Sequence, residues 1–334
     1  MLLYVTCYAQ EDRLSSETIS KVGTSVAQFL KIDVSARTVG MGGAFAAVAN
    51  DVSSIYTNPA GLARLNAYEA MFTHTEWIAE TNFDFGAFAM DLGTSGTIGF
   101  MVIAFSSGDM PVRTVESPDG TGELFDVSNM AAGISYARNL TEKFSIGFTA
   151  KYIQEQIWHM SANSVALDVG ALFTTPFWDV RLGASISNFG GKMELSGRDI
   201  KFAHDPDRNN DGNVSIVNAE HEMKSYPLPL RFQVGIAKDF TYGEYGRLTI
   251  AADALHPNDN FEYVNTGLEY GWKETIFLRA GYRSLFIDDT EEGLTLGAGA
   301  YLRLSGTLML RADYAYAEFG RLENAQRFSI SVRF

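Results

Sequence analysis

A glycine-rich stretch near the N-terminus contains the first residues whose types and spacing suggest chemistry. Residues 39–63 read VGMGGAFAAVANDVSSIYTNPAGLA, and closely spaced glycines can cradle a phosphate group. A nucleotide site also needs either a GK[ST] sequence or a G-x-G-x-x-G spacing after a buried strand. Neither pattern occurs in this stretch. The sequence therefore argues against nucleotide binding, and the glycines need another explanation.

A second stretch, residues 205–218, has the spacing of a calcium-binding loop. With Asp207 as position 1, oxygen-bearing residues occupy positions 1, 3 and 5, Gly212 occupies position 6, and Ser215 occupies position 9. Asn218 stands at position 12, where a bidentate glutamate belongs, and this lowers the expected affinity. A solvated turn rich in Asp and Asn is the alternative. The predicted calcium ligands are Asp207, Asn209, Asp211, Asn213, Ser215 and Asn218.

No catalytic group can be named from the sequence. The five histidines, at positions 74, 159, 204, 221 and 256, have no H-x-x-x-H or metal-cage spacing. A Ser-His-Asp triad is a spatial arrangement without a fixed sequence pattern, so a barrel lipase stays an open alternative. We predict that the protein is not an enzyme. The net charge of −14 and the absence of Lys/Arg runs exclude a nucleic-acid partner.

From about residue 68 onward, apolar and polar residues alternate with a period of two, which is typical of strands with one polar face. Ten or more residues per segment matches the 9 to 11 tilted residues with which a strand crosses a bilayer. The sequence thus predicts an all-β fold, a fourteen-stranded antiparallel transmembrane barrel. The predicted strands are 68–80, 81–92, 96–106, 127–139, 144–158, 162–174, 178–189, 226–238, 246–256, 261–273, 276–285, 293–304, 306–318 and 324–334.

Connection lengths also alternate, as they do in outer-membrane barrels, whose periplasmic turns are short and whose outer loops are longer. The even-numbered connections at 93–95, 140–143, 175–177 and the turn at Ser305 are short, whereas the odd-numbered ones include the long segments 107–126 and 190–225. The first connection, near Glu80, is a short exception. The pattern predicts a bacterial outer-membrane location.

Charged residues fall on one face of these strands. A charge that faces lipid at mid-bilayer costs roughly 2–4 kcal/mol, so this face must line the lumen. Both signs are present and can pair across neighbouring strands. We interpret the charges as ion pairs that fill the lumen: Lys151, Asp168, Arg181, Arg231, Asp253, Glu269, Arg279, Arg311 and Asp313. Aromatic residues near strand ends, including Trp77, Phe105 and Trp178, are placed as interface girdles would be.

The glycine-rich stretch is best explained as a compact plug inside this barrel. Glycines allow turns and close backbone approach, residues 44–49 can form a short helix, and Asn58 is a good N-cap before Pro59. Cys7-Tyr8-Ala9 resembles the end of a secretory signal. We predict a residual signal peptide at residues 1–9, an N-terminal segment and plug at 10–66, and the barrel at 67–334.

The N-terminal residues also resemble a known family. Ala36-Arg37, residues 40–45 and 47–51, Tyr56, and the sequence Asn-Pro-Ala-Gly-Leu at 58–62 look like the signature of PorV/PorQ outer-membrane proteins. Later motifs, such as Ser-Asn-Phe-Gly-Gly at 187–191 and Leu-Arg-Ala-Gly-Tyr at 278–282, are similar to that family too, so the resemblance covers about residues 21–334. It marks as plug residues Arg37, Gly40, Gly42, Gly43, Asn58, Pro59 and Gly61.

The resemblance implies a fourteen-stranded barrel with an N-terminal hatch, like the FadL-type fatty-acid channels, which share the Asn-Pro-Ala signature. The best-understood family members are accessory components of type IX secretion that hand secreted cargo to a surface complex. The expected partners are therefore outer-membrane lipid together with secreted cargo or secretion-complex proteins. The alternative is a FadL-like channel for a hydrophobic ligand. Calcium is the one cofactor that the sequence suggests.

Overall fold

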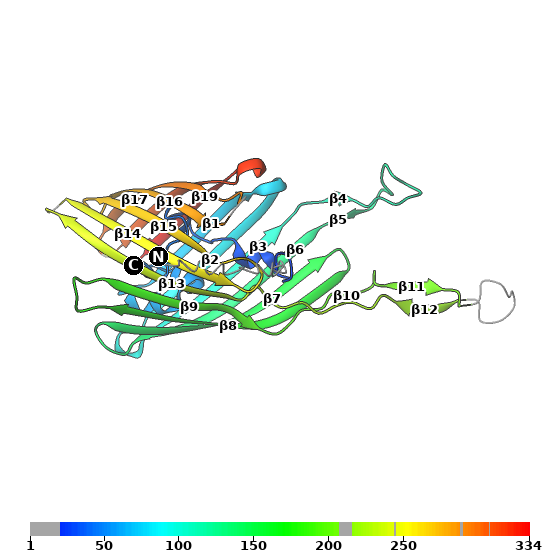
Figure 1. The fold of residues 1–334 in the computed structure, drawn as a ribbon, viewed down its shortest axis with the longest axis horizontal. Coiled ribbons are helices and arrows are strands. Elements are labelled where there is room, and N and C mark those ends of the chain that lie inside the picture. The colour runs from blue at the N-terminus through cyan, green and yellow to red at the C-terminus, as the bar shows by residue number, and fades with distance from the viewer. Residues whose placement is uncertain (1–20, 207–215, 244, 288–289, 307) are drawn as a thin grey trace, which may run out of the picture.

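The alternating segments form long antiparallel strands that close into a barrel (Figure 1). The computed structural model describes residues 21–206, 216–243, 245–287, 290–306 and 308–334. Within them, the fourteen barrel strands are β1 (Glu69–Trp77), β2 (Thr81–Asp91), β3 (Thr97–Ser106), β6 (Val127–Asn139), β7 (Phe144–Ile157), β8 (Met160–Thr174), β9 (Arg181–Gly190), β13 (Arg231–Tyr242), β14 (Gly246–Pro257), β15 (Tyr263–Trp272), β16 (Ile276–Leu285), β17 (Leu294–Ser305), β18 (Leu308–Glu318) and β19 (Asn324–Arg333).

Each strand pairs with its neighbours in the chain, and β1 pairs with β19 from Glu69↔Arg333 to Glu76↔Gln326, which closes the barrel. The long connection after β9 does not open it, because β13 returns to pair with β9 at Arg231↔Ser187. The predicted fourteen-stranded antiparallel barrel is confirmed.

The outward face of the barrel is apolar. Large side chains such as Phe72, Val102, Ile134, Val165 and Leu278 are each more than half exposed, and they alternate with buried residues along their strands. Apolar patches of more than a few hundred Å² are rare on soluble monomers. A continuous belt around a closed barrel is the surface that faces lipid. No helix among the described residues is long and apolar enough to span a membrane.

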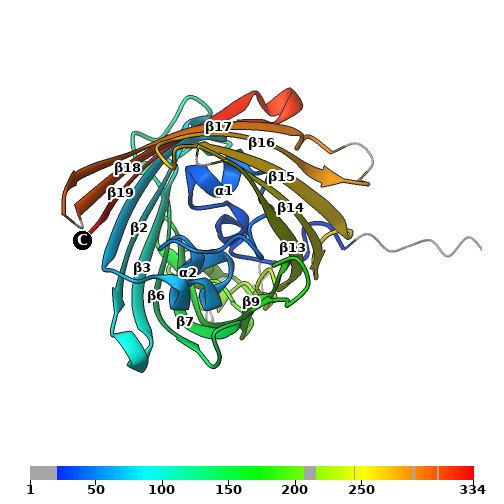
Figure 2. The ribbon, with the colours of Figure 1, turned by 90° about the vertical axis from the view of Figure 1, so that its left-hand side faces the viewer.

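The lumen is filled by the chain's own N-terminal part, which we call the luminal segment (residues 21–66). It contains η1 (Gln28–Lys31), α1 (Ala36–Gly40), α2 (Ser54–Thr57) and η2 (Pro59–Arg64), and Figure 2 shows α1 and α2 inside the ring of strands. The predicted helix at residues 44–49 is wrong: these residues form turns. The backbone N–H groups of Phe45 and Ala46 donate to the side chain of Asp253 on the barrel wall.

The two ends of the barrel differ. The inner end carries short turns such as η4 (Gly93–Ser95) and residues 140–143, and short turns mark the periplasmic side. The outer end carries two hairpins that project well beyond the wall (Figure 1). One consists of β4 (Met110–Pro111) and β5 (Leu124–Phe125), and the other of β11 (Lys201–His204) and β12 (Val217–Glu220).

Two details differ from the sequence predictions. The strand predicted at 226–238 begins only at Arg231, because Pro227 and Pro229 lack the N–H groups that a ladder needs. Trp77 and Phe105 do not stand in a lipid-facing girdle: both pack against the buried luminal core. The predicted signal peptide and the calcium ligands from Asp207 to Ser215 lie outside the described residues, whereas Asn218 lies in β12.

Candidate functional site

The luminal segment crosses the barrel from the outer to the inner end. Near the outer end, the Val26 N–H donates to the carbonyl of Pro227, just before β13. Ser35 caps α1 by accepting from the Arg37 N–H at 3.2 Å, and the Ala36 N–H donates to Ser329 on the wall. At the inner end, Tyr68 exchanges backbone hydrogen bonds with Phe334. The segment is thus held against the wall along its length.

The glycines after α1 let the segment touch the wall. Gly42 and Gly43 have φ values of 64° and 79°, in the left-handed region that favours glycine. A Cβ on Gly42 would lie 2.6 Å from the carbonyl oxygen of Thr266, and one on Gly40 would lie 3.1 Å from the Cα of Gly297. The glycines therefore provide a turn and a close approach between segment and strands, rather than a phosphate cradle.

Asn58, Pro59 and Gly61 lie deeper in the same segment. The Asn58 side chain caps η2 by accepting from the Ala60 N–H at 3.2 Å, as its position before Pro59 predicts. Its amide donates to the carbonyl of Ala46 at 2.8 Å. A Cβ on Gly61 would lie 2.6 Å from Ser54 Oγ. The three residues fold the segment back on itself.

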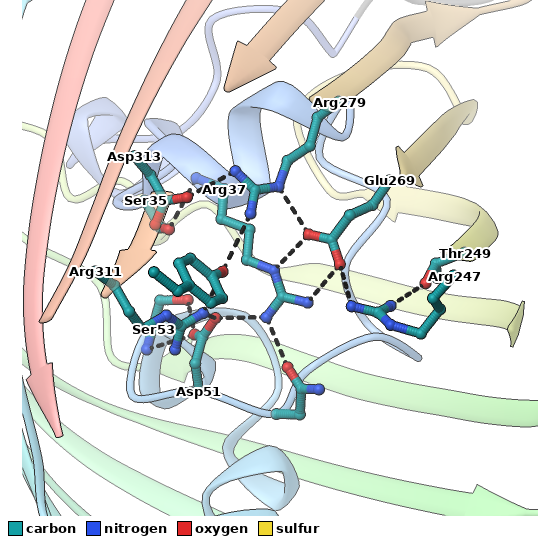
Figure 3. A network of polar contacts seen from close by, with 12 residues as sticks. Ser35, Arg37, Asp51, Ser53, Arg247, Thr249, Glu269, Arg279, Arg311 and Asp313 are labelled. Atoms are coloured by element: carbon teal, nitrogen blue, oxygen red, sulfur yellow. Dashed lines mark hydrogen bonds and ion pairs between the residues drawn. The ribbon is translucent and has the colours of Figure 1, made fainter. Parts of the chain in front are cut away.

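Arg37 joins the luminal segment to the barrel wall. Its guanidinium donates from Nε to Glu269 Oε2 at 2.9 Å and from Nη2 to Glu269 Oε1 at 3.0 Å. Nη1 donates to Asp51 Oδ2 at 2.7 Å and to Asn50 Oδ1 at 2.6 Å, both within the segment. A fully buried guanidinium thus binds two carboxylates, one on each side of the contact (Figure 3).

The wall extends this network in both directions. Glu269 also accepts from Arg279 Nε at 2.7 Å and Arg247 Nη2 at 3.2 Å, and Arg279 Nη1 donates to Asp313 at 2.7 Å. Arg311 lies on the other side, 3.1 Å from Glu69 and 3.5 Å from Asp51. The result is a continuous chain of charges of alternating sign, which we call the Arg37 network.

Burial and ion pairing act on the network in opposite senses. Burial raises the pKa of the Asp51 carboxyl, but the Arg37 and Arg311 guanidiniums outweigh it and lower this pKa below its ordinary value. Burial likewise lowers the pKa of Arg37, and the Glu269 carboxylate more than restores it. Both groups are therefore charged at neutral pH, and the contact between segment and wall is ionic.

The other predicted luminal charges occupy separate places. Lys151 pairs with Asp168 at 2.8 Å beside the register shift between β8 and β9. Arg181 binds Asp239 with two hydrogen bonds of 2.8 Å at the inner end. Asp253 holds the luminal turn, and Arg231 has a buried Nε without a hydrogen bond among the described residues. The predicted charges thus lie in several separate clusters along the lumen.

Sequence reasoning missed some members of the Arg37 network. Asp51, Glu69 and Arg247 were not among the predicted site residues, although all three bind predicted ones. Glu69 and Arg247 could have been found, because both follow the period-two pattern of inward-facing positions in their strands. Asp51 lies in a turn, and no periodic signal marks it.

A cavity of about 480 Å³ lies at the outer end, between the luminal segment and the wall. Val26, Phe29 and Ile32 contribute from the segment, and Trp77 and Phe105 from the strands. At its edge, Arg283 lies 3.0 Å from Asp33 and 3.3 Å from Glu292. The polar half of the lining consists of Gln28, Lys31, Asn129, Glu155, Arg283 and Glu292. A concave site that combines apolar side chains with polar groups is the ordinary form of a small-molecule site. Among the described residues, no His/Cys/Asp/Glu cluster could hold a metal ion.

Comparisons with known proteins agree with this geometry. Residues 5–154 match the sequence profile of a family described as an uncharacterised protein family (UPF0164). No curated protein matches. Among solved structures, the chain is similar to the Pseudomonas putida toluene transporter TodX, with 10% identity, 90% of this chain and 97% of that chain covered, and a TM-score of 0.55.

Two further structures match as well. The Ralstonia pickettii toluene transporter TbuX has 12% identity, coverage of 89% and 96%, and a TM-score of 0.53. A Pseudomonas aeruginosa FadL homologue has 12% identity, coverage of 90% and 98%, and the same TM-score. At this identity the likeness shows the fold alone. The fold is that of FadL-like barrels, and the chain is a β-barrel of the bacterial outer membrane.

Proposed function

We propose that the protein is a channel for hydrophobic small molecules, with the luminal segment as its movable plug. The observation that carries this proposal is the outer cavity, to which both the luminal segment and the barrel wall contribute apolar side chains. Its volume lies within the range of roughly 300–1,000 Å³ that is usual for ligand sites. One wall belongs to the barrel and the other to the luminal segment, so a ligand that binds there contacts both. The names of TodX and TbuX, both toluene transporters, support the same class of ligand.

Passage through this channel requires the luminal segment to move. Except for Asn50, which is exposed, the segment is buried in the lumen from residue 32 to residue 63, below the outer cavity. An apolar ligand that enters the cavity replaces water on the partly exposed side chains of Val26, Trp77 and Phe105. This gains roughly 25 cal/mol per Å² of apolar surface removed from water. The ligand shifts the luminal segment toward a rearranged, open conformation only if it binds that conformation more tightly than the closed one. The size of the shift is set by the difference between the two affinities.

The channel proposal predicts a difference between two phenylalanines on the same strand. Phe105 lines the outer cavity, whereas Phe100 faces lipid on β3. We expect Phe105→Ala to weaken toluene binding by the purified protein about five- to tenfold, since it removes apolar contacts worth roughly 1–1.4 kcal/mol. Phe100→Ala is the matched control and should leave the affinity unchanged. Equal affinities in both variants and the wild type would contradict the proposal.

A second candidate function rests on the outer hairpins. Val115 is fully exposed between β4 and β5, and Leu124 and Ile216 are more than half exposed on the two hairpins. Exposed apolar groups on projecting loops favour contact with another protein. In this alternative the protein is a PorV-like accessory of type IX secretion, and the hairpins bind exported cargo or a surface partner.

This alternative is tested by an affinity pull-down from the native outer membrane, solubilised gently. Replacing residues 110–125 with a short turn is expected to abolish recovery of secreted proteins that share a C-terminal sandwich-like domain. Recovery of the same proteins with the intact and the shortened hairpin would rule out the β4–β5 hairpin as their binding surface. Apolar molecules without protein partners would support the channel instead.

A further inference from the structure

A second cavity, of about 280 Å³, lies at the inner end of the barrel. Residues 47–50 and Arg64 of the luminal segment form one side, and Leu172 and Arg181 of β8 and β9 belong to the other. Ala47, Val48 and Leu172 are almost fully buried and give the cavity an apolar wall. The cavity is separate from the outer one and shares no lining residue with it.

Two guanidiniums reach this cavity without enough negative charge to balance them. Arg64 donates to the hydroxyls of Ser145 at 3.1 Å and Thr174 at 3.3 Å, and forms no ion pair with the described residues. Arg181 binds Asp239, but that carboxylate also accepts from Thr249 at 2.7 Å and lies 3.9 Å from Arg247. Hydroxyl groups satisfy hydrogen-bond donors but do not neutralise a charge.

The positive charges also act on one another. Partial burial, and then the charge of Arg181, lower the pKa of the Arg64 guanidinium. An anion between the two would remove this repulsion. Arginine is well suited to such a role, because its planar donor set matches carboxylate and phosphate oxygens.

We propose that the inner cavity is a binding site for a compact organic anion, a carboxylate or phosphate on a short apolar body. The anionic group lies between Arg64 and Arg181, and the apolar body packs against Ala47, Val48 and Leu172. Asn50 lines the same cavity and accepts from Arg37 Nη1 at 2.6 Å. An occupant therefore bridges segment and wall next to the Arg37 network, from the periplasmic side. The inference does not depend on what the outer cavity binds.

The test is an NMR titration of the full-length protein in zwitterionic micelles, with carboxyl-labelled butanoate and with butyl phosphate as separate probes. We expect saturable binding of at least one probe, and the better one identifies the preferred anionic group. Arg64→Gln should weaken that binding at least tenfold, whereas Arg64→Lys keeps the charge but not the planar donor set and should weaken it less than Arg64→Gln does. Arg138→Gln, at an exposed arginine near the inner end of β6, is the matched control and should change nothing.

Two further measurements keep failure of the proposal distinct from misfolding and from failure of the channel proposal. Val48→Phe fills the cavity without altering either cation and should also abolish binding. Toluene affinity reports on the outer cavity and should be the same in Arg64→Gln as in the wild type. Absence of saturable binding, binding that survives in Arg64→Gln, or an equal loss in Arg138→Gln would overturn the proposal. Equal binding of 1-butanol would overturn the requirement for an anion.

Discussion

Replacing Glu269 with glutamine is expected to loosen the luminal segment and to cost about 3–5 kcal/mol in the free energy of unfolding, the usual effect of removing one partner of a buried ion pair. Glu269 is fully buried and contacts three guanidiniums, those of Arg37, Arg247 and Arg279. Glutamine keeps the size of the side chain but removes the charge and replaces one acceptor with a donor. The guanidiniums of Arg37, Arg247 and Arg279 would then repel one another, because the carboxylate that lies between them has lost its charge.

Glu274 provides a matched control for this substitution. It binds Arg247 at 2.8 Å, as Glu269 does at 3.2 Å, but its side chain is 60% exposed. Exposed ion pairs contribute only about 0–1 kcal/mol. Glu274→Gln should therefore leave the free energy of unfolding in urea nearly unchanged. If the two variants unfold alike, the Arg37 network does not hold the segment to the wall.

Most of the barrel could be predicted from the sequence because the alternation of polar and apolar residues within each strand shows which side chains share a face. In β16, Arg279 and Phe277 point inward while Leu278 and Tyr282 face lipid, and counting by two is enough to assign them. The bounds of β6 and β16 agree with the predicted 127–139 and 276–285. Mid-bilayer lipid excludes charge, so the choice of face follows from energetics alone.

The lumen could not be predicted in the same way. Which carboxylate meets Arg37 depends on how far the luminal segment advances along the barrel, and this is set by the turn at Gly42 and the anchor at Asp253. Residues 44–49 form only one turn, closed by the hydrogen bond from the Ala49 N–H to the Phe45 carbonyl, and a turn this short has little helical stability of its own. Charge-assisted hydrogen bonds from the Phe45 and Ala46 N–H groups to Asp253 hold it against the wall.

Aromatic residues near strand ends were the least informative positions. Trp77 contacts Phe319 edge to face at 5.0 Å and lies over Arg327, inside the outer end of the barrel. A membrane-interface girdle and a cavity wall both use aromatic residues near the ends of strands. They differ only in whether the side chain points to lipid or to the lumen. Thr73 and Thr75 face inward in β1, and Trp77 is the next residue in this alternation. The alternation therefore indicated that Trp77 faces the lumen.

Deleting residues 21–66 is expected to leave a barrel that still inserts into membranes but conducts ions freely. The wall keeps ion pairs that do not involve the segment, namely Glu69–Arg311, Glu269–Arg279 and Arg279–Asp313. The strand ladders are also independent of the segment. Inserted barrels should therefore assemble, which a heat-dependent shift in gel mobility would check.

Single-channel recordings in planar bilayers measure the consequence. The deletion removes the buried elements α1, α2 and η2 from the lumen, and a barrel of this size without a plug encloses an aqueous channel. We expect the conductance of the deletion variant to rise above that of the intact protein. Shortening the outer hairpin at residues 110–125 is the control, because it removes chain outside the lumen and should leave conductance unchanged. Equal conductance of the deletion variant and the intact protein would mean that side chains of the wall, and not residues 21–66, close the barrel.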